Sequence, residues 1–371
     1  MHGMASGNQL IVPFGFPNGN IGSFHGRRQT AHMVEYPPKM PLLVPIFAAF
    51  LLIAPGLLSA QENDVRQPAC RIIPLPDHRT AFMHRGQQVA TWHFGPEYPR
   101  PFFYPLKSAR GTPLTRMGHP GAPDHDHHRS VWFAHHKIAG IDFWGDHGTG
   151  RIRQKQWLAY EDGENEAVMA VLLGWFNDKE QLLMEQEVVA AWRPGAGLGH
   201  ELELQLTFRP AADQLELEKT NFGFLAIRMA KELSGHFGTG QLRDSEQRQG
   251  EKAIFAKSAR WVDYSGPTVA VKDGREGIAY FDHPGNPHYP SHWHVRDDGW
   301  MGAGFSLKNA YTLKRESPLV LRYLLLAHSG NASHAQLEVM AKEFAQRPGF
   351  SVSRSKRPHR QFEARRLGKL E

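Results

Sequence analysis

Seven histidines crowd one stretch of the chain, and their side chains are the first candidates for chemistry. The stretch covers residues 118–147, and its histidines are His119, His125, His127, His128, His135, His136 and His147. Neutral imidazole is the commonest metal ligand in proteins and also titrates near neutral pH, so metal binding and proton transfer are both within its reach. In an extended chain His125 and His127 point to one side while Asp126 and His128 point to the other, so either pair can converge on one site.

A high density of histidines does not by itself define a metal site. The chain contains no HExxH or CxxC pattern with a defined ligand geometry. The cofactor therefore stays unknown, and for a divalent metal the candidate ligands are His119, His125 and His147. Some of the seven histidines are expected to be hydrogen-bonded loop residues, with two to four of the seven functional. Because His135 and His136 follow a strand-like apolar run, we expect one of them to face the core and the other to face water.

A second stretch, residues 281–300, combines polar side chains with aromatic rings in a loop rich in proline and glycine. The candidates in it are Asp282, His283, Asn286, Trp293, His294 and Arg296. Sugar sites use this combination, since rings stack on the apolar faces of a pyranose while carboxylates, amides and imidazoles bind its hydroxyls. The alternative is a proline-pinned loop whose aromatic rings fill the edge of the core. Arg228, Arg260 and Arg296 are candidates for binding an anion, or are paired surface residues.

Several classes of protein are disfavoured by what the chain lacks. It has no glycine-rich phosphate loop and no GxSxG motif, and its single cysteine, Cys70, has no histidine neighbour in sequence. The formal net charge is only +6, and much of the basic excess lies in the last twenty residues. We therefore expect no nucleic-acid partner, and we expect residues 351–371 to form a basic, disordered tail.

The N-terminal residues predict export. Residues 42–58 (LLVPIFAAFLLIAPGLL) form the only long apolar run, and small residues follow it as at a signal-peptidase site. We expect residues 1–60 to be an N-terminal extension and signal peptide, with a mature start near Gln61 and a periplasmic or secreted product. A true start codon at Met33 or Met40 would explain the residues that precede this signal. A retained membrane anchor is the alternative, but the run is short for one and contains Pro45 and Pro55.

The remainder of the chain predicts an all-β fold. Alternating apolar and polar residues recur from about 166 to 328, for example in AVMAVLLGWF, HELELQLTF, AIFAKSARWVDY and LVLRYLLLAHS, with glycine and proline between the runs. This pattern is typical of an antiparallel β-sandwich with long loops. One helix is expected over 334–346, capped by Ser333 and Gln336 and covering one sheet. No linker divides residues 61–350, so we expect a single domain there.

Several motifs resemble a known family. The motifs are DHDHHRSVWF (124–133), GIDFW (140–144), RWVDYSG (260–266), DHPGNP (282–287) and WHVR (293–296), and they span about residues 95–345. The chain resembles the PmoA-like exported proteins of environmental bacteria, a family labelled methane oxygenase. The methane monooxygenase subunit of that name is a membrane protein with several spans, which this chain is not expected to be. The strand succession is also similar to the galactose-mutarotase-like supersandwich, a fold-level analogy that fixes no reaction.

The resemblance and the local chemistry together predict a carbohydrate-active protein that uses histidines and acids for proton transfer, with or without a metal. The catalytic candidates are His127, His128, Asp142, Asp282 and His283. The sugar-binding candidates are Arg129, Trp144, Asn286, Trp293, His294 and Arg296. Lyase, epimerase and hydrolase chemistry stay open, and a hydrolase would need a pair such as Asp142 and Asp282. The alternatives are a histidine-ligated copper or iron oxygenase and a non-catalytic sugar-binding module. The sharpest expectation is that His127 and His128 meet Asp282 and His283 in one cleft.

Overall fold

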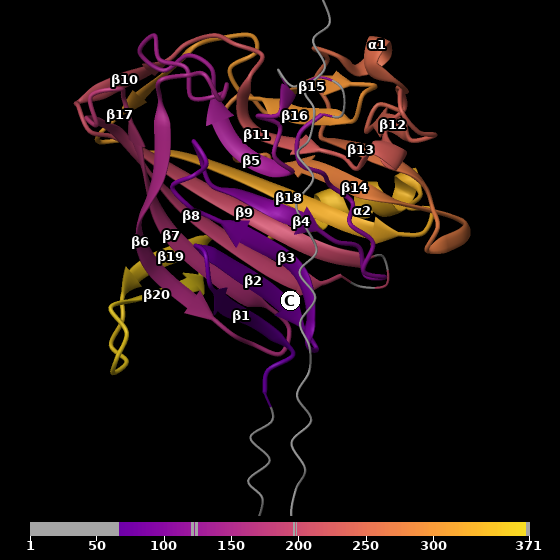
Figure 1. Ribbon diagram of the computed structural model, residues 1–371, viewed down its shortest axis with the longest axis horizontal. Helices are drawn as coiled ribbons and strands as arrows, with labels where there is room; N and C mark the ends of the chain where they lie inside the picture. Colours follow the sequence, from indigo (N-terminus) through magenta and orange to yellow (C-terminus); the bar gives the residue numbers. More distant parts are fainter. Residues whose placement is uncertain (1–66, 120–121, 123–124, 196, 198, 369–371) are drawn as a thin grey trace, which may run out of the picture. The chain divides into compact units, whose positions relative to one another are not determined.

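The computed structural model describes residues 67–119, 122, 125–195, 197 and 199–368 (Figure 1). These residues fall in one compact unit, Asp64–Glu371. The apolar run at 42–58 and the expected cleavage site lie outside the described residues. Within the described part of the chain, no helix is both long and apolar enough to cross a membrane.

Two eight-stranded antiparallel sheets form the body of this unit. The first sheet has the order β1 (Cys70–Leu75), β2 (Arg79–His84), β3 (Gln87–His93), β4 (Phe102–Leu106), β5 (Val131–His135), β11 (Gly223–Arg228), β16 (Trp300–Gly304) and β15 (His292–Arg296). The second has the order β12 (Gln241–Asp244), β13 (Trp261–Thr268), β14 (Val271–Asp282), β18 (Leu319–Ser329), β9 (Gly199–Pro210), β8 (Leu182–Pro194), β7 (Ala167–Phe176) and β6 (Arg151–Glu161). The two-stranded pairs are β10 (Gln214–Leu217) with β17 (Tyr311–Lys314) and β19 (Phe350–Arg354) with β20 (Phe362–Arg366). The predicted all-β antiparallel sandwich is confirmed.

The main core lies between the two sheets, and side-chain alternation along the strands builds it. In β14, Ile278 and Tyr280 belong to the central apolar cluster, whereas Ala279 and Phe281 belong to a cluster on the opposite face. The hydroxyl of Tyr280 donates to the backbone oxygen of Leu225 in β11 at 3.3 Å, which ties the second sheet to the first. The first sheet therefore presents its other face away from the core.

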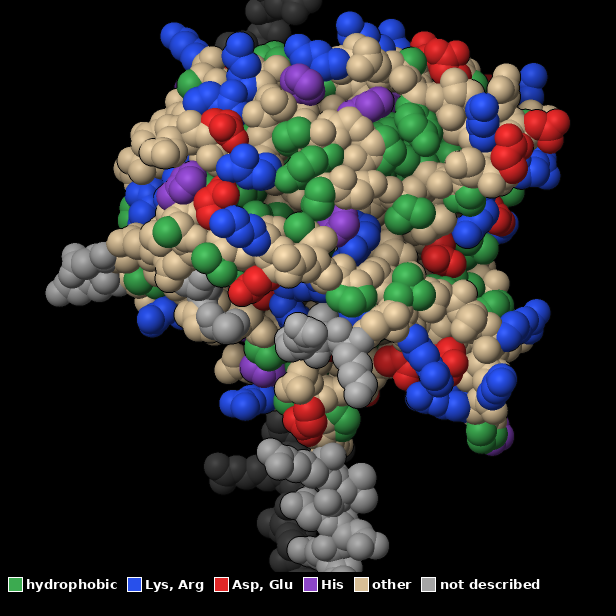
Figure 2. Space-filling model, turned by 180° about the vertical axis from the view of Figure 1, so that it is seen from behind, with side chains coloured by type: hydrophobic (Ala, Val, Ile, Leu, Met, Phe, Trp, Pro, Cys, Tyr) green, Lys and Arg blue, Asp and Glu red, His purple; other side chains and the backbone are tan. Residues whose placement is uncertain are grey.

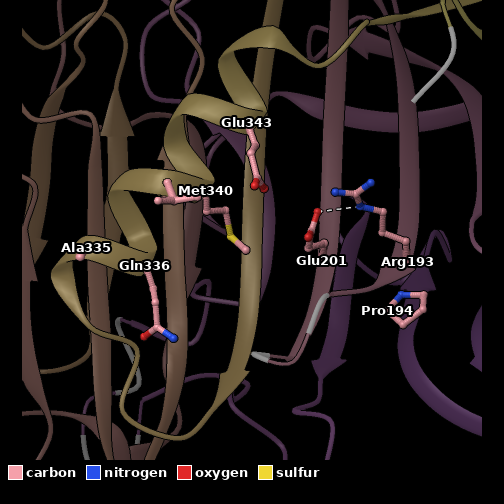
Figure 3. Close-up of a pocket in the computed structure, with 8 residues that line it drawn as sticks. Arg193, Pro194, Glu201, Ala335, Gln336, Met340 and Glu343 are labelled. Atoms are coloured by element: carbon pink, nitrogen blue, oxygen red, sulfur yellow. Dashed lines mark hydrogen bonds and ion pairs between the residues drawn. The ribbon is translucent and has the colours of Figure 1, made fainter. Parts of the chain in front are cut away.

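The outer face of the second sheet is covered by α2 (His334–Gln346). Ser333 and Gln336 form a capping box at its N-terminus, and Leu337, Met340 and Phe344 are its buried residues. The predicted helix, its cap and its role as a cover are confirmed. Figure 3 shows Met340 and Glu343 of α2 beside the ion pair of Arg193 and Glu201, across a cavity of about 500 Å³.

The alternation predicted a strand over 253–264, and the first half of that prediction is wrong. A short helix, α1 (Glu251–Ile254), lies there, and the strand begins only at Trp261. The backbone N–H of Glu251 donates to Asp297, and the Glu251 carboxylate accepts from the backbone N–H of Asp297. These two bonds hold the segment as a turn while Ile254 reaches the core.

The prediction of a disordered basic tail is wrong for residues 351–366, because β19 and β20 form a hairpin there. Phe350 and Ala364 pack on apolar residues of the outer face of the second sheet. The Arg366 guanidinium donates to Glu203 at 2.8 Å and also binds Glu166. The basic composition therefore reflects carboxylate partners on the sheet. Figure 1 shows the hairpin beside β6 and β7.

Cys70, at the start of β1, is fully buried. Burial, together with the charges of Glu164 and Glu166, raises the pKa of its thiol to about 11. The side chain is therefore a neutral thiol at physiological pH and acts as a core residue.

Candidate functional site

The candidate site lies on the face of the first sheet that points away from the second sheet. In β5, Val131 and Phe133 belong to the central core, while Trp132 and Ala134 belong to a cluster on the other side of the sheet. Trp300 joins that outer cluster from β16. The strands β5, β11, β16 and β15 are neighbours in this order in the sheet (Figure 1), and the residues that line a cavity here come from β11, from β15, β16 and the turn between them, and from the loops around β5 and before β11.

This cavity has a volume of about 330 Å³. Five histidines line it: His125, His127, His128, His136 and His294. Three aromatic side chains line it as well: Trp144, Phe222 and Trp300. The volume is at the lower end of the range for small-molecule pockets, and the mixture of rings with polar groups is typical of them.

A turn brings three of these histidines together. The backbone N–H of His128 donates to the oxygen of His125 at 3.0 Å, so the segment is not extended. The expectation that His125 and His127 point opposite to His128 is therefore wrong. Instead the ring centroids of His125 and His128 are 5.2 Å apart, and those of His127 and His128 are 4.2 Å apart.

His128 is the most deeply placed histidine of this turn. Its residue is only 6% exposed, and its ring packs against Trp300 and Trp132 with centroids 4.7 and 5.5 Å away. Burial, with the nearby charges of His127 and Arg228, lowers the pKa of His128 far below its usual range, so the ring is neutral. Among the described residues its Nδ1 atom has no hydrogen-bond partner. In native structures a buried polar atom without a protein partner is usually satisfied by an ordered water or another bound group.

His294, on β15, is held in one tautomer. Its Nδ1 atom lies 2.9 Å from the backbone oxygen of Asn221, which can only accept, so Nδ1 carries the proton. Burial lowers the pKa of His294 to about 4, so the ring is neutral and Nε2 bears a lone pair. The ring lies against Trp300 and Phe222, with centroids 5.1 and 5.2 Å away.

Each arginine that lines the cavity has a carboxylate partner. The fully buried Arg228 donates to both oxygens of Asp298, at 2.9 and 3.2 Å. Burial opposes ionisation of Asp298, but the hydrogen bonds and charge of Arg228 outweigh it and lower the pKa of Asp298. Arg296 pairs with Glu251 at 3.3 Å. The cavity therefore holds fixed, mutually compensated charges.

His136 and Asp142, two further lining residues of the cavity, face each other. Nδ1 of His136 lies 3.3 Å from Oδ1 of Asp142, an ion pair when the ring is protonated. The same carboxylate accepts from the backbone N–H groups of Trp144 and Gly145, at 2.6 and 3.2 Å. His135 is fully buried whereas His136 is partly exposed, which confirms the expectation of one core-facing and one water-facing histidine.

Of the predicted site residues, the cavity brings together His125, His127, His128, Asp142, Trp144, His294 and Arg296. Arg129 lies behind the wall, where it donates to both oxygens of Asp146 at 2.7 and 2.6 Å. Trp293 is fully buried in the core, with its indole N–H donating to the Ala259 oxygen at 2.8 Å.

Asp282, His283 and Asn286 do not line this cavity, so the expectation of one cleft shared by the two segments is wrong for them. Asp282 accepts from the Asn286 amide at 2.7 Å and from the backbone N–H of Ser291 at 2.8 Å. His283 lies 2.9 Å from the guanidinium of Arg322 and packs on Phe344 of α2. These residues hold the loop after β14 in place. Their role is therefore structural, which was the alternative to a sugar site for residues 281–300.

The residues predicted as metal ligands do not fit a metal centre. His119 and His125 have ring centroids 5.5 Å apart, and His119 Nε2 lies 3.6 Å from Asp298. His147 lines a neighbouring cavity. Over the described ranges, no three His, Cys, Asp or Glu side chains are grouped so that they could hold a metal ion.

Sequence reasoning missed part of the site. Asp298, Trp300 and His136 lie within the stretches 281–300 and 118–147, but none of them was predicted as a catalytic or binding residue. Arg228 was predicted either to bind an anion or to be a paired surface residue; it is paired with Asp298, but it is buried. Phe222 carried no signal in the sequence, because its role depends on the loop that leads into β11.

Over its described residues, the fold and the site define this chain as an antiparallel β-sandwich protein with a cavity of histidines and aromatic rings on one sheet face. The chain belongs to a family of unknown function (DUF6807), whose model matches residues 79–342. That description does not support the methane-oxygenase label. No curated protein sequence matches the chain.

One solved structure that the chain matches is a GalM/aldose epimerase homologue from C. elegans. It is 8% identical, the match covers 70% of this chain and 98% of that chain, and the TM-score is 0.31. A likeness this weak gives no information about activity.

Proposed function

We propose that this protein is a carbohydrate-active enzyme that transfers protons on a sugar bound above the first sheet. The observation that carries the proposal is the position of His294, a neutral histidine with a fixed tautomer, in a small cavity beside Trp300 and Trp144. Indole faces stack on the apolar side of a sugar ring, and the polar groups between them bind hydroxyls.

Two histidines that line the cavity differ in their capacity to accept and donate protons. His294 is neutral at physiological pH and can accept a proton at Nε2, as a general base does. The His136 ring lies 3.3 Å from the Asp142 carboxylate and also lines the cavity, so we assign it the role of general acid. A base and an acid around one sugar ring are what ring opening or epimerisation needs.

The charge pairing favours an uncharged sugar. Arg228 and Arg296 are each bound to a carboxylate, so neither brings an uncompensated positive charge for an acidic substituent. Arg228 is still able to stabilise negative charge that develops on a sugar oxygen, because its fixed position costs no reorganisation during the reaction.

Two other reactions receive less support. The carboxylates suggested for a hydrolase, Asp142 and Asp282, do not share the cavity. Among the described residues, the donor set for a copper or iron oxygenase is not grouped. A sugar-binding module without turnover is the second candidate, and the experiment below distinguishes it. As part of the proposal, the enzyme is exported, as the apolar run at 42–58 predicts.

The test is exchange chemistry on simple sugars in D2O, followed by NMR. Incubation with D-glucose, D-galactose or D-xylose should accelerate anomer interconversion or introduce deuterium at a ring carbon. His294→Gln should reduce the rate at least a hundredfold. His288→Gln is the matched control, because His288 also contacts a backbone oxygen through Nδ1, at 3.1 Å, but does not line the cavity. Binding without turnover would identify a binding module, and equal losses in both variants would contradict the role of His294.

A further inference from the structure

A second cavity adjoins the candidate site. Its volume is about 720 Å³, against about 330 Å³ for the first, and the two share His127, Asp142 and Gly145 as lining residues. Because the same residues line both, the cavities adjoin each other along His127, Asp142 and Gly145. We refer to the first as the inner cavity and to the second as the outer cavity.

The two cavities differ in chemistry. The inner cavity has indole and phenyl rings, whereas the outer cavity adds Asp126, Asp146, His147 and Thr149. Carboxylate, imidazole and hydroxyl groups bind the hydroxyls of a sugar from the side. The outer cavity is thus suited to a hydroxyl-rich group that continues from a ring held in the inner one.

The wall of the outer cavity is built in advance of any ligand. Asp146 accepts two hydrogen bonds from Arg129 and lies 3.3 Å from the fully buried Arg100. Burial opposes ionisation of Asp146, but the hydrogen bonds and charge of Arg129 outweigh it and lower its pKa. Because two arginines compensate its charge, the carboxylate is a fixed hydrogen-bond acceptor with little capacity left for a cation.

Glycine is required where this wall meets the shared residue Asp142. A Cβ atom at Gly148 would lie 2.4 Å from the Asp142 backbone oxygen and 3.1 Å from its carboxylate. A Cβ atom at Gly145 would also lie 3.1 Å from that carboxylate. The loop from Asp142 to Thr149 therefore closes around Asp142 and leaves the outer cavity open beside it.

The geometry points to a substrate of at least two sugar units, with one ring in the inner cavity and the next unit in the outer cavity. This inference rests on the proposed function and names its substrate class, a neutral oligosaccharide or glycoside. The inner ring is the one that meets His294, and the outer unit contributes binding through hydroxyl contacts.

The test compares D-glucose, D-galactose and D-xylose with cellobiose, lactose and xylobiose. For the wild-type protein, kcat/KM for the preferred disaccharide should exceed that for its monosaccharide at least tenfold. Thr149→Trp places an indole at an exposed position of the outer cavity and should bring this ratio close to one. Asp178→Trp, at an exposed turn between β7 and β8, is the matched control and should leave the ratio unchanged.

The outcomes separate this inference from the proposed function. Equal kcat/KM for both sugar sets, with activity still dependent on His294, would overturn the second subsite and leave the proposed function standing. Retention of the disaccharide preference in Thr149→Trp would also overturn the subsite. Absence of turnover and of calorimetric binding for every sugar would overturn the proposed function and this inference together.

Discussion

Two buried polar clusters of this protein have similar composition and different hydrogen bonding. Around Asp282, both carboxylate oxygens and both polar atoms of the Asn286 amide have partners, including the backbone of Arg322 at 2.7 and 2.8 Å. Around His128, in contrast, Nδ1 of the ring and Nε of Arg228 have no partner among the described residues, and both side chains line a cavity. Histidines and acids with all their bonds made within the chain hold a loop in place. Side chains that line a cavity and still have a hydrogen-bonding atom without a protein partner are candidates for contact with a ligand.

The strongest test of this contrast is to truncate Asp282, whose two carboxylate oxygens both have hydrogen-bond partners. Asp282→Ala leaves one N–H of the Asn286 amide and the Ser291 N–H without acceptors in the interior, while the other amide N–H keeps the Arg322 oxygen. We expect the free energy of unfolding to fall by about 3–5 kcal/mol, since each buried unsatisfied donor costs roughly 1–3 kcal/mol. Urea denaturation measures this, with Asp178→Ala at an exposed turn as the control. Sugar affinity of the folded protein should be unchanged, and loss of affinity without loss of stability would reverse the roles of the two clusters.

The same carboxyl group should give stability a distinctive pH dependence. Burial raises the pKa of Asp282 from 3.8 to about 6 in the folded protein. Between these values the folded state binds more protons than the unfolded state. Protonation of Asp282 in the folded state therefore adds about 3 kcal/mol to the free energy of unfolding. This stabilisation is complete below pH 3.8 and is lost as the pH rises through 6. Urea denaturation at pH 4, 5, 6 and 7 should show the loss in the wild-type protein and a flatter profile in Asp282→Asn. Parallel profiles would show that Asp282 is ionised throughout.

A smaller effect is expected from an aromatic wall of the inner cavity. Trp144→Leu keeps an apolar side chain but removes the indole face, and stacking on such a face contributes roughly 0.5–1.5 kcal/mol. Sugar affinity measured by calorimetry should fall about threefold to tenfold. The matched change Trp157→Leu, at a half-buried tryptophan of β6 outside the cavity, should leave affinity unaltered. Equal losses in the two variants would mean that the cavity does not bind sugar through Trp144.

The smallest change in stability is expected at His128, where a polar atom is buried without a partner. His128→Leu removes that atom and keeps most of the contact with Trp132 and Trp300. The free energy of unfolding should change by no more than about 1 kcal/mol, in either direction, while turnover of sugars is lost. A loss of stability as large as that of Asp282→Ala would show that His128 is a structural residue and would remove the contrast.

The sequence predicted local features well. Alternation gave the β-sandwich, and the spacing of Ser333 and Gln336 gave the cap of α2, because both depend on neighbouring residues alone. The burial of His135 beside the more exposed His136 followed from strand alternation for the same reason. None of these three predictions depends on which strands pair with each other.

The composition of the site was predicted only in part, because hydrogen-bond satisfaction depends on distant partners. Asp282 is the last residue of β14 and His128 lies in the loop before β5, and both belong to histidine-rich stretches with tryptophans nearby. What separates them is the presence of Ser291 and Arg322 beside the first and of an open cavity beside the second. The hairpin at 351–366 was not predicted for the same reason. The carboxylates that pair with Arg366, Glu166 and Glu203, lie far away in the sequence.

The buried thiol of Cys70 is an internal probe of how often the first sheet opens. The chain has one thiol, which is fully buried on an edge strand and has its pKa raised to about 11. A thiol-reactive reagent can modify it only when β1 separates from β2 or when the whole molecule unfolds. Because there is a single reactive group per chain, the rate of labelling in the absence of denaturant directly reports the frequency of that opening. Comparison of this rate with the global unfolding rate shows whether the edge of the first sheet opens by itself.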